Sequence, residues 1–345
     1  VKLPNDEQLL AMTKKGFAQE VKQTEETAVA TSILSKKPTP GKVVKTTKVD
    51  DFGATTYTLS NGIKVTTKPT TFKSDEIIIR GLKKGGSDNY GVADVNDVRY
   101  ATDVVSSMGY GEFTPSDLTK VTAGKTISVG VSFGDVSNNV SGSSTVKDLE
   151  DMFQLLYLKL TQPRIDEDLF EAYKKKQIMQ LQFLSANPTV AFIDTLFGDL
   201  YAKNPLAPSP IPKPEHFEAL SMKRAVDIYI DEFSSADGYE FFIVGNIDDK
   251  TLVPLIETYL GGLQETGKAA DFKDNGVRPI KATKTLKYYK GSEPKSMIFS
   301  IIHGETKYSE DLSLHVNALA EVLNIRVIEE LREKLGGIYG GGYRA

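Results

Sequence analysis

Residues 56–67 read Thr-Tyr-Thr-Leu-Ser-Asn-Gly-Ile-Lys-Val-Thr-Thr, and this stretch is the strongest local signal in the chain. Two runs of alternating, β-branched residues flank the dipeptide Asn61-Gly62. Asparagine and glycine tolerate the positive φ angles that a type I′ turn requires at both of its central positions. We therefore expect a β-hairpin here, closed by a type I′ turn.

Outward from the hairpin, predicted strands and helices follow one another in an α+β pattern. The apolar alternation indicates strands at 76–82, 126–133, 138–145 and 239–245. Helical spacing of apolar residues indicates helices at 92–108, 146–160, 166–185, 188–201, 222–233 and 248–259. The five prolines of 204–214 predict a loop between the helices at 188–201 and 222–233.

The flanking segments suggest how the chain divides. Residues 5–32 favour a linking helix, and the Pro-, Gly- and Lys-rich stretch 35–41 favours extended backbone. Beyond residue 281 we expect strands at 285–289 and 295–302, a helix over 311–334, and another strand starting at Ile338.

We accordingly predict three parts. They are a linker helix with an extended segment (1–50), a complete α+β unit (51–265), and the beginning of a further α+β unit (275–345), which is truncated. The last part spans only about 65 residues, below the usual size of a domain.

Composition excludes several classes of protein. The 345 residues are 40% hydrophobic, and 42 basic against 46 acidic residues give a net charge of −4 with interspersed signs. A disordered chain and a nucleic-acid partner are therefore disfavoured. With no cysteine there is no disulfide and no thiolate zinc site.

No apolar run reaches the ~18 residues of a membrane span, and the first thirty residues lack the apolar core of a signal peptide. Because the chain begins at Val1, we interpret it as a piece of something longer.

The three histidines do not form a local metal motif. His216, His303 and His315 are at least twelve positions apart, whereas a zinc site of the H-x-x-E-H type needs two imidazoles four residues apart. No serine-hydrolase, P-loop or dinucleotide motif is present either. The glycines of 336–342 follow a helix, so they are at the wrong end of it to bind phosphate. No catalytic and no metal-binding residue is predicted in this chain.

Arg332 and Tyr339 are the candidate binding residues. Arg332 falls in the last turn of the predicted long helix, and Tyr339 follows seven residues later in the predicted strand. In one interpretation the arginine complements the helix dipole and the tyrosine is a sheet aromatic. In the other, guanidinium and phenol point together into a cavity as hydrogen-bond donors to a substrate carbonyl.

The sequence around these residues resembles a known family. Leu331–Tyr339 resembles the R-E-K-L-G-x-x-Y signature of the pitrilysin/insulinase family of inverted zinc metallopeptidases, in its bacterial zinc-protease branch. Leu59–Val65 resembles the L-x-N-G-x-x-V hairpin that opens each domain of that family, and Phe242–Asp249 resembles a segment that closes one.

The resemblance implies a fold and a role. It implies repeated metallohydrolase-like domains, each a mainly antiparallel sheet packed with helices on one face. It also implies that this chain is the non-catalytic C-terminal half of a zinc endopeptidase, forming chamber wall and substrate-positioning surface. Arg332 and Tyr339 are then substrate-binding, and zinc belongs to the parent protein rather than to this segment. The partners implied are the N-terminal catalytic half and an unfolded peptide, in the periplasm or cell envelope.

Two other interpretations remain open. A catalytically silent, peptidase-like subunit that acts as a binding partner has the same sequence features. An unrelated α+β protein that binds a peptide or ligand is the third possibility, and a structure without two similar helix-on-sheet units favours it.

Overall fold

The computed structural model describes residues 4–18, 32–184, 187–268, 270–292, 294 and 296–345. The chain divides into two compact units, Val1–Lys290 and Gly291–Ala345. Within the predicted linker helix, α1 (Asp6–Phe17) is capped by Asn5, whose side chain accepts a hydrogen bond from the backbone N–H of Gln8. The remainder of that predicted helix, 19–31, lies outside the described residues.

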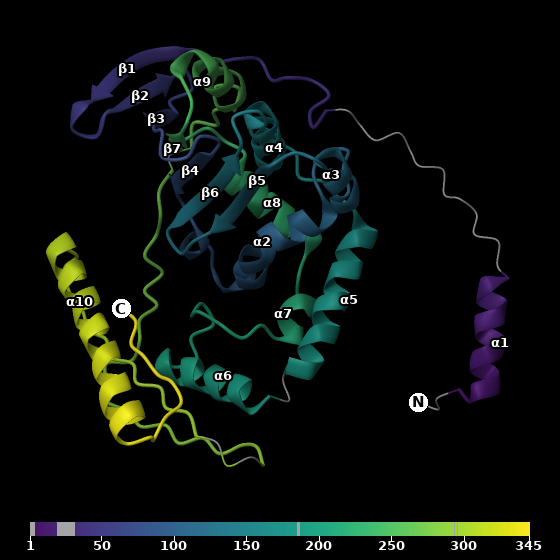
Figure 1. Ribbon diagram of the computed structural model, residues 1–345, viewed down its shortest axis with the longest axis vertical. Helices are drawn as coiled ribbons and strands as arrows, with labels where there is room; N and C mark the ends of the chain where they lie inside the picture. The colour runs from purple at the N-terminus through teal and green to yellow at the C-terminus, as the bar shows by residue number, and fades with distance from the viewer. Residues whose placement is uncertain (1–3, 19–31, 185–186, 269, 293, 295) are drawn as a thin grey trace. The chain divides into compact units, whose positions relative to one another are not determined.

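A seven-stranded sheet forms the frame of the first unit (Figure 1). Its strands lie in the order β1 (Val43–Val49), β2 (Ala54–Leu59), β3 (Lys64–Pro69), β7 (Glu240–Gly245), β4 (Ile77–Lys84), β6 (Ser137–Ser144) and β5 (Ile127–Phe133). Only β3 and β7 run parallel, and every other neighbouring pair is antiparallel. The predicted strands at 76–82, 126–133, 138–145 and 239–245 are confirmed. The extended segment before the hairpin supplies β1 as an edge strand.

The hairpin of β2 and β3 is confirmed, but its turn type was predicted wrongly. The N–H of Gly62 donates to the carbonyl of Leu59, and Gly62 alone among the turn residues has a positive φ, +79°. Asn61 therefore lacks the positive φ of a type I′ turn, and the loop is a three-residue type with glycine in the left-handed region. The physical reason is a distant contact: the Asn61 side chain donates to the carbonyls of Leu260 and Leu263, at 2.9 and 3.0 Å.

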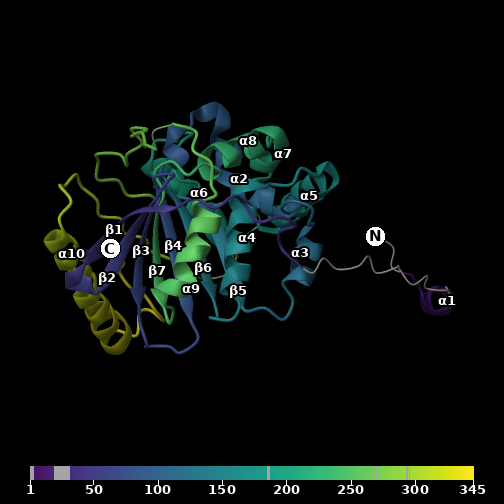
Figure 2. The same cartoon turned by 90° about the horizontal axis from the view of Figure 1, so that it is seen from above.

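Helices cover one face of this sheet. The helices of the first unit after α1 are α2 (Val95–Met108), α3 (Pro115–Val121), α4 (Leu149–Thr161), α5 (Glu167–Leu184), α6 (Pro188–Leu200), α7 (Pro214–Glu218), α8 (Met222–Phe233) and α9 (Asp249–Leu255), the last continued by a π-helical turn (Ile256–Leu260). Short 3-10 turns lie at Asp50–Phe52, Ser87–Asn89 and Val92–Asp94. Figure 2 shows α2, α4 and α8 on the same side of the strands, and α2 packs against α8. All the helices predicted between 92 and 259 are confirmed.

Local sequence explains where these helices begin and end. The Asn187 side chain accepts a hydrogen bond from the N–H of Thr189 at 2.9 Å, and Pro188 occupies the first turn of α6, as the Asn-Pro pair predicts. Gly109 ends α2 with φ +98°, where a Cβ atom would lie 2.1 Å from the carbonyl oxygen of Phe113. Only glycine fits at that position.

The core lies between the sheet and these helices. In β4 the burial alternates strictly, with Ile77 and Ile79 fully buried and Arg80 and Leu82 exposed. On the helix side, Val104, Met108 and Phe153 are fully buried against it. One face of the sheet is therefore packed and the other is open, as the fold class requires, and the predicted α+β architecture is confirmed.

The second unit contains one long helix, α10 (Glu310–Val327), continued by a π-helical turn (Ile328–Lys334), which confirms the helix predicted over 311–334. The strands predicted at 285–289, at 295–302 and from Ile338 are wrong for the residues that are described, since these segments have no regular structure. Apolar alternation alone does not make a strand, because its hydrogen bonds need a neighbouring strand, and among the described residues none pairs with these segments.

Candidate functional site

Arg332 lies in the π-helical turn that continues α10, as predicted. Its side chain is 52% exposed, and its Nε atom is 3.7 Å from a carboxylate oxygen of Glu333. A contact of this kind between adjacent exposed residues is weak, so the guanidinium keeps most of its hydrogen-bonding capacity. Arg332 thus lies at the surface of the second unit.

Tyr339 follows in the irregular segment after the helix, where Gly336 has φ +57° and ends the helical backbone. The tyrosine is 98% exposed. No hydrogen bond between described residues joins it to Arg332. The structure therefore presents both candidate binding residues to solvent without bringing them together.

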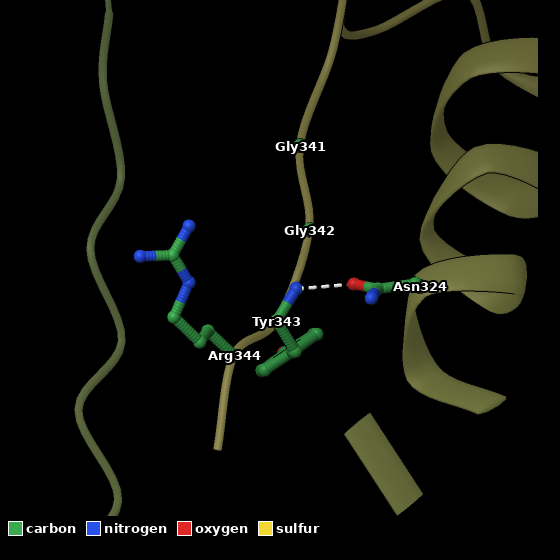
Figure 3. Close-up of a pocket in the computed structure, with 5 residues that line it drawn as sticks. All are labelled: Asn324, Gly341, Gly342, Tyr343 and Arg344. Atoms are coloured by element: carbon green, nitrogen blue, oxygen red, sulfur yellow. Dashed lines mark hydrogen bonds between the residues drawn. The ribbon is translucent and has the colours of Figure 1, made fainter. Parts of the chain in front are cut away.

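The chain after Tyr339 runs back along α10 (Figure 3). The N–H of Tyr343 donates to the side-chain oxygen of Asn324 on that helix, and a shallow pocket lies between them. A Cβ atom on Gly342 would be 2.9 Å from the same oxygen, so the glycine allows this close approach. Figure 3 shows the Arg344 guanidinium pointing away from Asn324. Neither Arg332 nor Tyr339 lines the pocket. Of the glycines of 336–342, Gly342 therefore has a structural reason, which is its close approach to Asn324.

The open face of the sheet in the first unit is a second candidate surface, which was not predicted from the sequence. Its centre is apolar and exposed: Leu82, Phe242 and Val244 are 48%, 46% and 41% exposed. In the strand register Phe242 lies beside Arg80, and Val244 lies beside Ile78. The alternation of apolar and polar residues along 77–84 contains this signal, because it places Arg80, Leu82 and Lys84 on one side of the strand. We call six exposed residues on this side of the sheet the open sheet face; they are Lys68, Arg80, Leu82, Lys84, Phe242 and Val244.

Cations surround the apolar centre of the open sheet face. Lys64 forms an ion pair with Glu240 at 3.0 Å, while the Arg80 guanidinium donates to the backbone carbonyl of Ile79 at 3.2 Å. Lys84 lies 6.0 Å from the ring of Phe272, and Lys68 is exposed. A surface with this mixture can contact the apolar side chains of an extended chain and attract its carbonyl and carboxylate groups.

Two of the three histidines have neighbours within their own unit. His216 lies beside Tyr100, with 3.4 Å between its Nδ1 atom and the tyrosine hydroxyl, and burial lowers its pKa. His315 pairs with Asp311 on its own helix at 3.3 Å. Among the described residues no three His, Cys, Asp or Glu side chains come together as a metal site requires. Helix α2 carries no histidine.

Among the described helices, none is both long and apolar enough to cross a membrane.

Comparison with known proteins places these features in a family. Residues 223–343 match the model of the peptidase M16 inactive domain. The chain is 24% identical over 294 residues to the probable zinc protease PqqL of Haemophilus influenzae, covering 82% of this chain and 30% of that protein. It is 22% identical over 329 residues to a PQQL-like zinc protease of Arabidopsis thaliana, covering 91% of this chain and 31% of that protein.

A solved structure agrees. The periplasmic protease PqqL from Escherichia coli superposes with a TM-score of 0.75 at 19% identity, covering 99% of this chain and 37% of that one. This chain therefore spans about a third of the length of these relatives. The resemblance to the pitrilysin/insulinase peptidases is confirmed: residues 223–343 match the peptidase M16 inactive domain, and the chain is similar in sequence and in fold to PqqL zinc proteases.

Proposed function

We propose that this chain is the non-catalytic C-terminal half of a zinc-dependent endopeptidase and forms one wall of the chamber that holds the peptide substrate. The observation that carries the proposal is the open sheet face. Phe242, Val244 and Leu82 are each more than two-fifths exposed, and they lie on two adjacent central strands of the seven-stranded sheet. Exposed apolar residues gathered in this way mark a binding surface.

The catalytic chemistry in this proposal comes from elsewhere in the parent protein. The relatives are named zinc proteases, and this chain covers about a third of each. Because the histidines of this chain do not assemble a zinc site, the metal and the hydrolytic groups are assigned to the N-terminal half. That half and the unfolded peptide are the two partners, and the periplasm is the proposed compartment, as the name of the Escherichia coli structure states for that protein.

We further propose that Arg332 and Tyr339 position the substrate once the halves are together. Their exposure, 52% for the arginine side chain and 98% for the tyrosine, supports this role, since neither donor is consumed inside its own unit. A guanidinium and a phenol hydroxyl are suited to hold peptide carbonyl groups.

The proposed domain organisation keeps the predicted limits. It consists of a linker over 1–50, a complete unit over 51–265 and the beginning of another unit over 275–345. The exposure of the apolar side of α10 supports the last of these, with Leu314, Leu319 and Ile325 between 56% and 67% exposed. A helix of this kind normally packs against a sheet.

The experiment is reconstitution. The chain is assayed for zinc and for peptide cleavage alone and after mixing with the N-terminal half of the parent protein. We expect neither zinc nor cleavage from the chain alone, and cleavage from the mixture. Phe242→Ser on the open sheet face, Arg332→Ala and Tyr339→Phe should each raise KM in the mixture. Lys176→Ala, on the exposed side of α5, is the control that should not. Stoichiometric zinc with cleavage by the chain alone would overturn the proposal.

A further inference from the structure

The two edge strands of the sheet, β1 and β5, differ in whether their outward backbone groups are already hydrogen-bonded. On the β5 edge, a lysine side chain occupies one of them. Gly134 donates its N–H to the carbonyl of Ser137, so the even-numbered residues of β5 bond to β6. The odd-numbered residues therefore turn their N–H and C=O groups outward. Lys159 donates its ammonium to one of these, the carbonyl of Val129, while lying 5.4 Å from the centre of the Tyr110 ring. A partly buried lysine thus occupies an acceptor that an added strand would use.

On the β1 edge, the outward backbone groups of the central residues form no hydrogen bond with any other described residue. In β2 the odd-numbered residues bond to β3, as the N–H of Leu59 donating to Ile63 shows. The even-numbered residues of β2 therefore bond to β1, opposite its odd-numbered residues. Thr46 and Lys48 consequently turn their backbone N–H and C=O groups to the outer side. Among the described residues no strand pairs with that side.

Strand β1 is also exposed on both of its faces, unlike the other strands. Every residue from 44 to 48 is exposed. Val44 is 63% exposed near one end of the strand, and Phe52 is 67% exposed in the turn beyond the other end. An added strand would therefore find an open backbone edge and an apolar contact near each end.

The charged side chains of β1 and of the residues just before it are all positive. Residues 36–49 contain five lysines and no aspartate or glutamate. Lys37 pairs with Glu150, and the Lys48 ammonium donates to the hydroxyl of Thr55 at 2.9 Å. Lys42 and Lys45 form no ion pair with any described residue. Because Lys45 and Lys48 are three positions apart, they project from opposite faces of the strand.

We propose that the outer edge of β1 docks an acidic, extended segment of another protein, which adds to the sheet as an eighth strand. Backbone groups of Thr46 and Lys48 supply the hydrogen bonds, and the lysines select carboxylates on the added strand. A second copy of this chain is disfavoured as the occupant, because two such edges would bring lysines together. The proposal does not depend on the proposed peptidase function.

The test uses the full chain and a synthetic probe, a peptide of about ten alternating glutamate and threonine residues, long enough to span the strand. Binding is followed by fluorescence anisotropy, and the site is located by amide hydrogen exchange. We expect the peptide to slow exchange at Thr46 and Lys48 and to bind more weakly as salt is raised. The same peptide with alternate amides N-methylated keeps its charge but cannot pair, so it should not bind.

Two matched pairs of variants separate backbone from charge. Thr46→Pro removes an outward N–H and leaves the bonds to β2 in place, so it should abolish binding, whereas Thr46→Val should not. Lys42→Glu with Lys45→Glu should weaken binding at least about tenfold, whereas Lys176→Glu on α5 should leave it unchanged. Circular dichroism verifies that each variant is folded.

The proposal is overturned if the N-methylated peptide binds as well as the unmodified one, or if exchange at Thr46 and Lys48 does not change. It is also overturned if a peptide of alternating lysine and threonine binds equally well. None of these results concerns zinc or the N-terminal half, so the reconstitution experiment stands or fails separately.

Discussion

Asn61 shows how one side chain can fix a hairpin to a distant part of the chain. Its amide donates to the carbonyls of Leu260, Gly261 and Leu263, at 2.9, 3.3 and 3.0 Å. These carbonyls lie at the end of the π-helical turn Ile256–Leu260 and just after it, where the backbone has no helical donors left. The asparagine of the hairpin motif is therefore a structural residue in this unit.

We predict that Asn61→Asp lowers the free energy of unfolding by about 1–3 kcal/mol at neutral pH, because a carboxylate has the same size but cannot donate to these carbonyls. Urea denaturation followed by circular dichroism measures the change. Asn139→Asp is the control, since its amide bonds only the hydroxyl of Ser137 on its own strand, at 3.2 Å. Equal effects of the two substitutions would contradict this role for Asn61.

Lys83 is a buried amine whose titration we expect to appear in the stability of the protein. The residue is 5% exposed, and its ammonium donates to the hydroxyl of Ser235 at 2.9 Å. Burial lowers its pKa from 10.5, with Glu232 and Asp237 opposing the change in part. Between the lowered pKa and 10.5 the unfolded chain binds more protons than the folded protein. Stability contributed at this site therefore rises as the pH rises through that interval.

The prediction is that Lys83→Met removes this part of the pH dependence. Unfolding free energies of wild type and variant, measured from neutral pH up to pH 10, should show a larger gain with pH for the wild type. Lys84→Met, the exposed neighbour on the other face of β4, is the control and should follow the wild type. If the free energies of unfolding of wild type and Lys83→Met change with pH in parallel, burial does not lower the pKa of Lys83.

At the residue scale the sequence predicted the existence of the hairpin but not the form of its turn. Asn61-Gly62 satisfies a type I′ turn locally, yet the bonds from Asn61 to residues about two hundred positions later decide its backbone conformation. Such a contact has no signature in a local pattern. Arg332 and Tyr339 were located in the sequence, and their role in binding stays a prediction.

At the scale of elements, the ion pair between Arg224 and Asp94, which we call the clamp, joins α8 to the start of α2. Arg224 donates from Nε and Nη2 to the two carboxylate oxygens of Asp94, at 2.7 and 2.9 Å. The hydrogen bonds from Arg224 lower the pKa of Asp94 from 3.8. Because the folded-state pKa is the lower one, the clamp stabilises the protein above pH 3.8, and its contribution is lost as the pH falls through the folded-state pKa.

We predict that Asp94→Asn lowers the free energy of unfolding at pH 7 by about 1 kcal/mol, a modest value because both side chains are partly exposed. The difference from wild type should vanish in strongly acidic solution. Asp227→Asn breaks an exposed pair with Lys223 on α8 and is the matched control, with an expected change under about 0.5 kcal/mol. A difference that persists unchanged at acidic pH would rule out the ionised clamp as its cause.

Periodicity predicted the elements of the first unit well, because each has one buried and one exposed side. It missed β1, whose residues 44–48 are all exposed and carry no burial pattern, and the short helices α3 and α7. It placed strands at 285–289 and 295–302, and the described residues of these segments form none. The open sheet face was missed for a related reason: exposed apolar residues such as Phe242 and Val244 look like core residues in a sequence.

At the scale of the whole molecule, the two units differ in how they bury apolar surface. All buried hydrophobic residues of the described chain lie between Ile33 and Leu263. Beyond that point Ile298 and Ile302 are 91% and 86% exposed, and no residue of α10 is buried. Since burial of apolar surface is the main stabilising contribution to a fold, the first unit contains its own core and the second does not.

We therefore predict that ending the chain at Lys290 leaves the free energy of unfolding within about 0.5 kcal/mol of the full chain, since none of the described residues after Lys290 is a buried hydrophobic residue. In the full chain, amides of 296–345 should exchange within seconds to minutes, while those of β4 and β7 should be protected to the limit of global unfolding. Thermal denaturation and hydrogen exchange measure both. A large loss of stability on truncation would mean that the second unit shares the core of the first. In that case the residues after 290 would have to be assigned to the first unit instead of to the beginning of another one.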